Sequence, residues 1–285
     1  MKNILTRTAL SLFLAVSSYL VCGCTETLAG CQPDQADSNS VETILKQLKE
    51  KTTKLKSYQV QVEYLFKQPL LESETLRKGV LYYLKFDGKS KLRVNFQTLK
   101  QDDEKEQKYL EHFIFDGIWL THIDYQIKAV KRHQLAEPNK PVEDVFDLAS
   151  RNLPIIGFTK IEDLKKQFEI KLVPSAAEGL AQQEKESVSV IPAQAGIHEF
   201  SHLHLKTKPD SIYKDGYTSI DFWIDKKIFL PTKVIAVSTE EDIYEIKFLQ
   251  PKINEKMDTK VFEFEVPKDF TVEIIPLKKK ANGGN

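Results

Sequence analysis

The chain has 285 residues, with 41 Lys plus Arg, 41 Asp plus Glu, and 3 Cys that all lie at or before position 31. This charge balance excludes a bulk electrostatic attraction to nucleic acids or anionic membranes. The chain beyond position 31 has no cysteine, so a hydrophobic core must stabilise the fold there without disulfides, and this length is sufficient for one or two domains.

Residues 1–23 have the pattern of a secretory signal. Lys2 and Arg7 make a positive start, and residues 9–21 follow as an uncharged apolar run. This order is typical of a signal peptide, and the run is shorter than the roughly 20 apolar residues of a transmembrane helix. We therefore expect export and leave this segment out of the fold.

Two cysteines are candidates for a lipid anchor. The motifs VCGC, which ends at Cys24, and LAGC, which ends at Cys31, both resemble a bacterial lipoprotein signal, where the Cys becomes the lipid-carrying N-terminus. Cys24 follows the apolar run directly and is preferred; Cys31 is the alternative, and an ordinary signal with incidental cysteines is the other interpretation. Neither candidate cysteine is followed by Asp, the residue that retains some lipoproteins at the inner membrane. By analogy this favours an outer-membrane anchor on the periplasmic side of the bacterial envelope.

Residues 24–40 are mostly polar and predict a flexible tether. Residues 41–58 are predicted to be mostly helical, with the end of the stretch passing into a strand, because Ser40 is a suitable N-cap and apolar residues recur at spacings of three, four and seven. Further helices are expected at residues 141–152 and 159–168.

Alternation of apolar and polar residues predicts a long series of strands. The first set would form a six-stranded antiparallel meander with turns at Asp87-Gly88 and Asp116-Gly117. The predicted strands are residues 58–66, 79–85, 92–97, 110–115, 118–125 and 127–135, then 169–173, 202–208, 217–225, 230–239, 243–249 and 261–266.

Residues 175–201 interrupt this pattern. They are rich in Ala, Gln, Glu, Ser and Gly and have poor periodicity, which predicts an inserted surface loop. We expect one domain over residues 41–275, followed by a disordered tail over residues 276–285.

Several predicted strands carry bulky residues on both faces. A sheet that curves around an apolar interior and is partly covered by helices requires this, and such an incomplete barrel can hold a ligand cavity. The predicted fold is α+β and β-dominated: an unclosed, strongly curved antiparallel sheet with helices covering its concave face. Aromatic residues fill most cores, so ordinary packing is the alternative to a cavity. The candidate cavity-lining residues are Tyr64, Phe66, Tyr82, Leu84, Phe96, Phe113, Phe115, Trp119, Phe222 and Trp223.

Several stretches together resemble the outer-membrane lipoprotein carrier family (LolA-like). They are LKSY ending at Tyr58, GVLYY starting at Gly79, LRVNF with its basic Arg93, FDGIWL starting at Phe115, and VFEFEVPKDFTV starting at Val261. The resemblance covers residues 41–275 apart from the loop, and it implies a bent sheet that binds lipoprotein acyl chains beneath helices. The family's Lys-Arg-Pro before the third strand is absent here, so a lid-fixing arginine cannot be assigned.

His198-Glu199-Phe200-Ser201-His202 matches the H-E-x-x-H motif of zinc hydrolases. That motif binds zinc from a helix, whereas Pro192 and Gly196 precede it here and an alternating, strand-like pattern follows it. A zinc hydrolase is therefore a remote alternative, and His198, His202 and His204 are weak metal candidates. We interpret His112, His122 and His133 as surface or edge residues rather than catalytic ones.

We therefore expect a non-enzymatic, monomeric envelope protein that binds lipid or lipoprotein acyl chains and takes part in lipoprotein sorting or transfer. It would need no cofactor and would not bind nucleic acid. The main alternative is a sensor or scaffold of the same fold, with a filled interior, that binds a protein partner in the envelope.

Overall fold

The computed structural model describes residues 40–86, 89–142, 161–174 and 199–277. Residues Ser38–Asn285 form one unit, and the description below refers to this unit alone. The predicted signal, both candidate lipidation sites, the turn at Asp87-Gly88, most of the helix at 141–152 and most of the loop at 175–201 lie outside the described residues and stay predictions.

The chain enters the fold through helix α1, Val41–Thr53. The Ser40 hydroxyl accepts a hydrogen bond from the Thr43 amide at 3.2 Å, as the N-cap prediction requires. Ile44, Leu45 and Leu48 are buried, so the apolar face is the predicted one. The helix is shorter than predicted, because the chain turns into a strand at Ser57.

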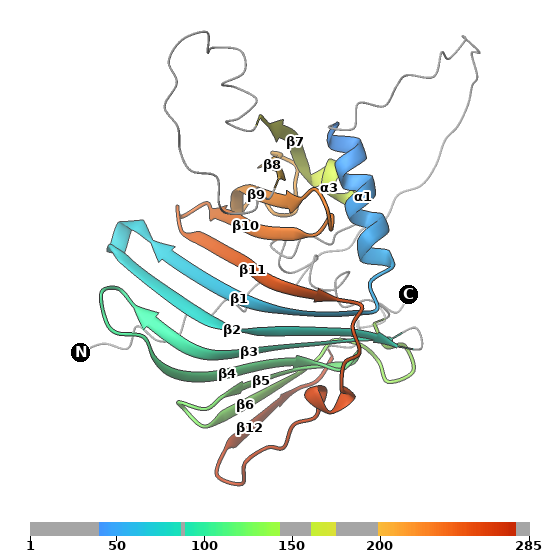
Figure 1. The fold of residues 1–285 in the computed structure, drawn as a ribbon. Coiled ribbons are helices and arrows are strands. Elements are labelled where there is room, and N and C mark those ends of the chain that lie inside the picture. Colours follow the sequence, from blue (N-terminus) through green and yellow to red (C-terminus); the bar gives the residue numbers. More distant parts are fainter. Residues whose placement is uncertain (1–39, 87–88, 143–160, 175–198, 278–285) are drawn as a thin grey trace, which may run out of the picture. The chain divides into compact units, whose positions relative to one another are not determined.

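The predicted six-stranded meander is confirmed (Figure 1). Each strand pairs antiparallel with the next, and the turn at Asp116-Gly117 places Gly117 at a φ of 101°, which favours glycine. The strands are β1 Ser57–Gln68, β2 Ser73–Phe86, β3 Lys89–Gln101, β4 Gln107–Phe115, β5 Trp119–Asp124 and β6 Ala129–Gln134, with a short 3-10 helix, Pro69–Leu71, between β1 and β2.

The second half adds a short helix and five more antiparallel strands. Its elements are α3 Ile161–Gln167, β7 Phe168–Val173, β8 Phe200–Thr207, β9 Tyr217–Asp225, β10 Pro231–Ser238 and β11 Ile243–Ile253. Strand β8 begins within the predicted loop, because Phe200 and Ser201 already pair with Asp225 and Ile224 of β9. The predicted strand at 217–225 has the bounds of β9.

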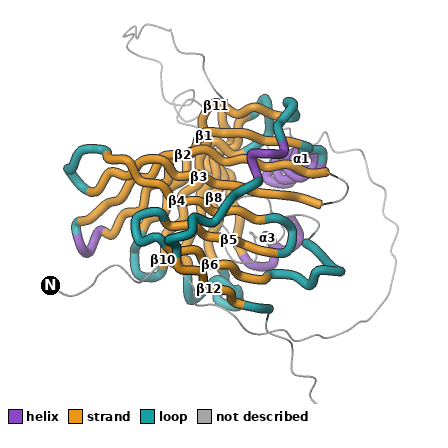
Figure 2. The backbone as a smooth tube through the Cα atoms, turned by 90° about the horizontal axis from the view of Figure 1, so that it is seen from below, coloured by secondary structure: helices purple, strands orange, loops and turns teal. Residues whose placement is uncertain are grey.

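All strands of the described residues form one 12-stranded sheet in the order β12-β6-β5-β4-β3-β2-β1-β11-β10-β9-β8-β7. The two end strands, β12 and β7, do not pair with each other, so the sheet is bent but unclosed (Figures 1 and 2). The predicted fold class is confirmed, with one parallel pair, β12 with β6, in an otherwise antiparallel sheet.

The end of the chain differs from the prediction. The predicted strand at 261–266 is wrong: a 3-10 helix, Thr259–Phe262, stands there, and the last strand is β12, Thr271–Ile275. The Arg93 guanidinium explains the difference, since one of its nitrogens donates to the carbonyls of Val261 and Glu263, both at 2.8 Å. These carbonyls bind a side chain instead of a neighbouring strand, and the segment crosses in front of the sheet in Figure 1.

The main core lies on the face of the sheet that the helices cover, which we call the inner face. Buried residues of α1 and Leu164 of α3 belong to the same apolar cluster as the inward side chains of nearly every strand from β1 to β11. A second, smaller core lies on the opposite, outer face, where Phe264 and Phe270 of the C-terminal segment pack on Ile114, Ile123 and Val130. The sheet therefore buries apolar side chains on both faces, as the bulky residues in adjacent positions predicted.

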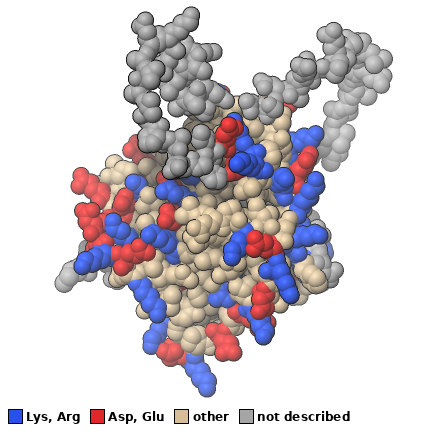
Figure 3. Space-filling model, in the orientation of Figure 1, with Lys and Arg blue, Asp and Glu red and all other residues tan. Residues whose placement is uncertain are grey.

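Basic and acidic side chains are interspersed over the molecular face drawn in Figure 3. This distribution agrees with the equal numbers of basic and acidic residues in the sequence. It gives that face no field of one sign that would attract a polyanion.

Candidate functional site

A row of aromatic rings crosses the inner face. Residues directly opposite each other on paired strands share a face, and the register places Tyr64, Phe96 and Phe113 inward. Ring centroids are 6.2 Å apart between Tyr64 and Phe96 and 6.3 Å between Phe96 and Phe113. Phe113 stacks on His122 of β5 at 4.4 Å, so the row ends on an imidazole.

The row continues towards the other half of the sheet. Phe66 of β1 stacks on Tyr244 of β11 with centroids 4.9 Å apart, and Tyr244 contacts Tyr217 of β9 at 6.2 Å. We define the aromatic row as Tyr64, Phe66, Phe96, Phe113, Tyr217 and Tyr244. The row joins strands that lie far apart in the sequence into one apolar surface.

Most of the aromatic row is only partly buried. Phe96 is buried, whereas Tyr64, Phe66, Phe113 and Tyr244 keep part of their surface accessible. In the apolar cluster that includes the buried residues of α1, by contrast, Tyr58, Val60 and Tyr83 are at most 2 % exposed. The inner face thus has a filled part and a part where the described residues leave aromatic surface uncovered.

The phenols of the row have no acid–base role near neutral pH. Burial raises the pKa of Tyr244 to about 12, with a smaller contribution from Asp242. Burial also raises the pKa of Tyr64 well above its ordinary value. Both side chains therefore stay protonated and contribute apolar area and a hydroxyl.

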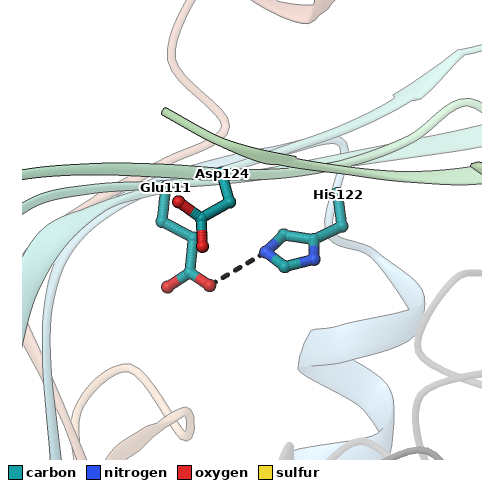
Figure 4. Close-up of side chains that lie close together, drawn as sticks. All are labelled: Glu111, His122 and Asp124. Atoms are coloured by element: carbon teal, nitrogen blue, oxygen red, sulfur yellow. Dashed lines mark hydrogen bonds and ion pairs between the residues drawn. The ribbon is translucent and has the colours of Figure 1, made fainter. Parts of the chain in front are cut away.

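A polar cluster lies at the end of the row. Glu111 of β4 pairs opposite Phe96 on one side and Asp124 on the other, so its carboxylate points inward. Figure 4 shows Glu111, His122 and Asp124 projecting to the same side of the strands. His122 Nε2 lies 2.9 Å from Glu111 Oε1, and a guanidinium nitrogen of Arg77 lies 3.5 Å from Glu111 Oε2. We call these four residues the polar cluster.

Three members of the polar cluster could ligate a metal ion. Ligand atoms of Glu111, His122 and Asp124 all lie within 4.8 Å of one another, and one imidazole with two carboxylates is a donor set that zinc accepts. However, Glu111 already accepts from His122 and faces Arg77, whose positive charge opposes a cation. The cluster is better suited to hydrogen bonding than to metal binding.

The register divides the predicted cavity-lining residues between the two faces. Six of them, Tyr64, Phe66, Phe96, Phe113, Phe115 and Phe222, point inward, whereas Tyr82, Leu84, Trp119 and Trp223 point outward. On the outer face Trp119 lies under Arg132, at 5.0 Å from ring centroid to guanidinium carbon, and Trp223 stacks on His202 at 4.2 Å. Lining of a cavity stays a prediction for the inward six, and the outward four lie on the opposite side of the sheet.

Sequence reasoning missed several residues of the site. Tyr244 was not singled out, and neither were Arg77 and Glu111, which are charged residues at inward positions of strands. His122, interpreted as a surface or edge histidine, is an inward residue that bonds Glu111. The alternation of the strand could have identified Glu111. Side chains two residues apart in a strand share a face, so Glu111 lies on the same face of β4 as Phe113.

The H-E-x-x-H motif does not form a helix in its described part. Phe200, Ser201 and His202 belong to strand β8, whereas His198 lies outside the described residues. His202 Nε2 and His204 Nδ1 both lie within hydrogen-bond distance of the same Asp221 oxygen, at 2.7 and 3.0 Å. These contacts give both imidazoles a structural partner on the outer face.

No family model matches the sequence, and no curated protein matches it. Solved structures with a similar arrangement include the lipoprotein LppX of Mycobacterium tuberculosis, with 13% identity, a TM-score of 0.41, and coverage of 77% of this chain and 99% of that one. A LolA superfamily protein from Nitrosomonas europaea has 12% identity, a TM-score of 0.33, and coverage of 78% and 97%. MucB of Pseudomonas aeruginosa, in its complex with MucA, has 12% identity, a TM-score of 0.41, and coverage of 78% and 60%.

These are distant likenesses, and the fold class rests on the strand order of this chain itself. Within the described ranges, no helix combines the length and the apolar character that crossing a membrane requires.

Proposed function

We propose that this protein binds the acyl chains of lipids or lipoproteins on the inner face of its bent sheet and acts without catalysis, in lipoprotein sorting or transfer to the outer membrane. The observation that carries the proposal is the aromatic row. It consists of two groups of contacting rings that meet along β1, where Tyr64 and Phe66 share the inner face. Most of its rings keep accessible surface.

The energetics are favourable for a long hydrocarbon chain. Each methylene group that leaves water contributes about 0.8 kcal/mol, so a chain of about 15 methylenes gains roughly 12 kcal/mol before costs. Association and ordering cost about 4–15 kcal/mol, which leaves room for micromolar affinity. Aromatic rings suit this task because they offer a large rigid area at low entropic cost.

The proposed location follows from the start of the sequence. Export by the signal at residues 1–23 and lipidation at Cys24, or alternatively Cys31, would anchor the domain through the tether at residues 24–40. A tethered monomer at the outer membrane would then receive or hold an acylated partner close to the lipid surface. An anchored binder suits a receptor or resident role better than that of a soluble shuttle.

A second candidate is a scaffold that binds a protein partner, and the edge strand β12 favours it. Val272 and Ile274 are 47% and 59% exposed, and among the described strands β12 pairs with β6 alone. An exposed apolar edge strand can pair with a strand of another chain. If this scaffold function is correct, Ile274→Lys should abolish chemical cross-linking between the chain and its protein partner. Binding of acyl chains should stay unchanged.

The proposal is tested with the chain whose candidate anchor cysteines, Cys24 and Cys31, are replaced by Ser. Binding is followed by the fluorescence of a dodecanoyl chain labelled at its methyl end. Phe113→Asp puts a charge on the inner face and should weaken binding at least about tenfold, which corresponds to about 1.4 kcal/mol. Leu84→Asp puts the same charge on the outer face and should leave the affinity unchanged.

Circular dichroism and the urea midpoint show whether both variants fold, and Phe113→Ala is the milder substitute if Phe113→Asp does not. Equal weakening by the inner and outer variants, or no binding by the parent chain, would refute the proposal.

A further inference from the structure

The aromatic row and the polar cluster form one continuous surface. Glu111 and Phe113 lie two residues apart on β4 and therefore share the inner face. Phe113 stacks on His122, the same imidazole that bonds Glu111. A hydrocarbon chain that lies along the row would therefore bring its polar end to the polar cluster.

Glu111 is buried without a full set of hydrogen bonds. Its side chain is 3% exposed, and Oε1 is paired with His122. Oε2 faces the Arg77 guanidinium at 3.5 Å but has no hydrogen-bond partner among the described residues. A carboxylate oxygen removed from water in this way loses free energy that a ligand N–H or O–H would restore.

Arg77 has a buried donor without a hydrogen-bond partner among the described residues. This donor is its Nε, and its guanidinium lies over the Tyr109 ring at 5.4 Å. Arg77 thus offers a donor beside the acceptor of Glu111. One ligand group that carries both a donor and an acceptor would satisfy the two.

The charge of the polar cluster determines which polar end group of a ligand it accepts. Glu111 and Asp124 are negative, Arg77 is positive, and His122 is neutral unless protonated. Lys131 of β6 lies opposite His122 in the sheet. Its Nζ is 3.6 Å from Glu273 Oε2, so its charge is paired with that carboxylate. With an uncharged imidazole, the formal charges of the cluster sum to −1, from two carboxylates and one guanidinium. A ligand carboxylate would then meet Glu111 in a site shielded from water.

We infer that the inner face selects amphiphiles whose polar end is an uncharged hydrogen-bonding group, above all an acyl amide, over free fatty acids. The amide N–H would donate to Glu111 Oε2, and its carbonyl would accept from Arg77 Nε. This inference rests on the proposed function, because it assigns the polar end of a ligand whose chain lies on the aromatic row.

The test compares dodecanamide, monododecanoylglycerol and dodecanoate, each below its micelle concentration, as competitors of the labelled dodecanoyl probe at about pH 8. The amide should bind about tenfold more tightly than dodecanoate, with the glycerol ester between them. Glu111→Gln removes the negative charge at nearly constant shape and should reduce this ratio to about threefold or less. Glu63→Gln, on the outer face of β1, is the matched control and should leave the ratio unchanged.

Asp124→Asn serves as the second variant if Glu111→Gln does not fold, and it should raise the dodecanoate affinity about threefold by removing the other negative charge. Equal affinity for amide and carboxylate, or tighter binding of the carboxylate, would overturn the inference and leave the proposed function standing. Failure of all three competitors and of the probe would overturn both.

Discussion

Replacing Arg93 should release the C-terminal segment from the outer face. The Arg93 side chain leaves β3 on that face and makes a set of bonds that no apolar residue can replace. One nitrogen donates to the carbonyls of Val261 and Glu263 at 2.8 Å, Nε donates to Asn95 Oδ1 at 2.6 Å, and another nitrogen lies 3.2 Å from His112 Nδ1. Arg93→Met keeps much of the aliphatic stem and removes these contacts.

The expected loss follows from these bonds. Hydrogen bonds to a charged group contribute roughly 1.5–3 kcal/mol each, and less where solvent reaches them. Because the guanidinium is partly exposed, we expect a loss of about 2–4 kcal/mol in the free energy of unfolding. That is a large share of the roughly 5–15 kcal/mol typical of a domain.

Urea denaturation measures this loss, and hydrogen exchange locates it. Exchange should accelerate in residues 259–275, because the segment and strand β12 lose their attachment, while β9 and β10 stay protected. Arg132→Met is the matched control: Arg132 is partly buried and lies over Trp119 at 5.0 Å, a contact that contributes about 0.5–2 kcal/mol. Equal urea midpoints for the two variants, or unchanged exchange in residues 259–275, would refute the reasoning.

Three further predictions concern single residues. Gly79→Ala should lower the free energy of unfolding in urea by about 1–3 kcal/mol, because the added Cβ would collide with the Asn95 backbone carbonyl. An unchanged urea midpoint would contradict this. Leu45→Ala, in the buried face of α1, should cost about 2–5 kcal/mol in the same assay. Burial and the Arg93 charge lower the pKa of His112 to about 4 from 6.5. The free energy of unfolding should therefore decrease as the pH is lowered from 6.5 to 4, by up to about 1.4 kcal/mol per pH unit. His112→Gln should remove that component.

The sign of the pH effect follows from proton uptake. Between these two pKa values the unfolded chain binds a proton at His112 that the folded chain does not bind, so acid favours unfolding. An NMR titration of the His112 imidazole gives the folded pKa directly. A value near 6.5 would contradict the assigned burial and charge.

Strand periodicity predicted most of the fold. The meander and β9 could be recognised because alternation and turn residues are local signals that the sheet preserves. The end of α1 was placed too late, because Leu55 continues the helical spacing but is buried after the helix has ended. Helix ends are decided by the pairing of the following strand, which no local pattern contains.

Two errors of the sequence interpretation have a common physical cause. Residues 261–266 alternate like a strand, but the long-range bonds from Arg93 hold the carbonyls of Val261 and Glu263 on the outer face. Similarly, Tyr82 and Tyr83 are equally bulky neighbours, and only the pairing of Tyr83 with Tyr58 shows that Tyr83 is the inward one. Composition identifies apolar strands, whereas register and distant partners decide which face lines the interior.

The polar cluster was also beyond local prediction. Glu111 is a single acidic residue in an apolar strand, and its partners Arg77 and His122 come from two other strands. Only the folded sheet brings them together.

Cross-linking by a dodecanoyl chain that carries a diazirine near its methyl end tests the central claim most directly, because mass spectrometry then identifies the residues that touch the hydrocarbon. The structure predicts cross-links to inner-face residues such as Tyr64, Phe96 and Phe113. Cross-links confined to the outward residues Tyr82 and Trp223 would contradict acyl-chain binding inside the bent sheet.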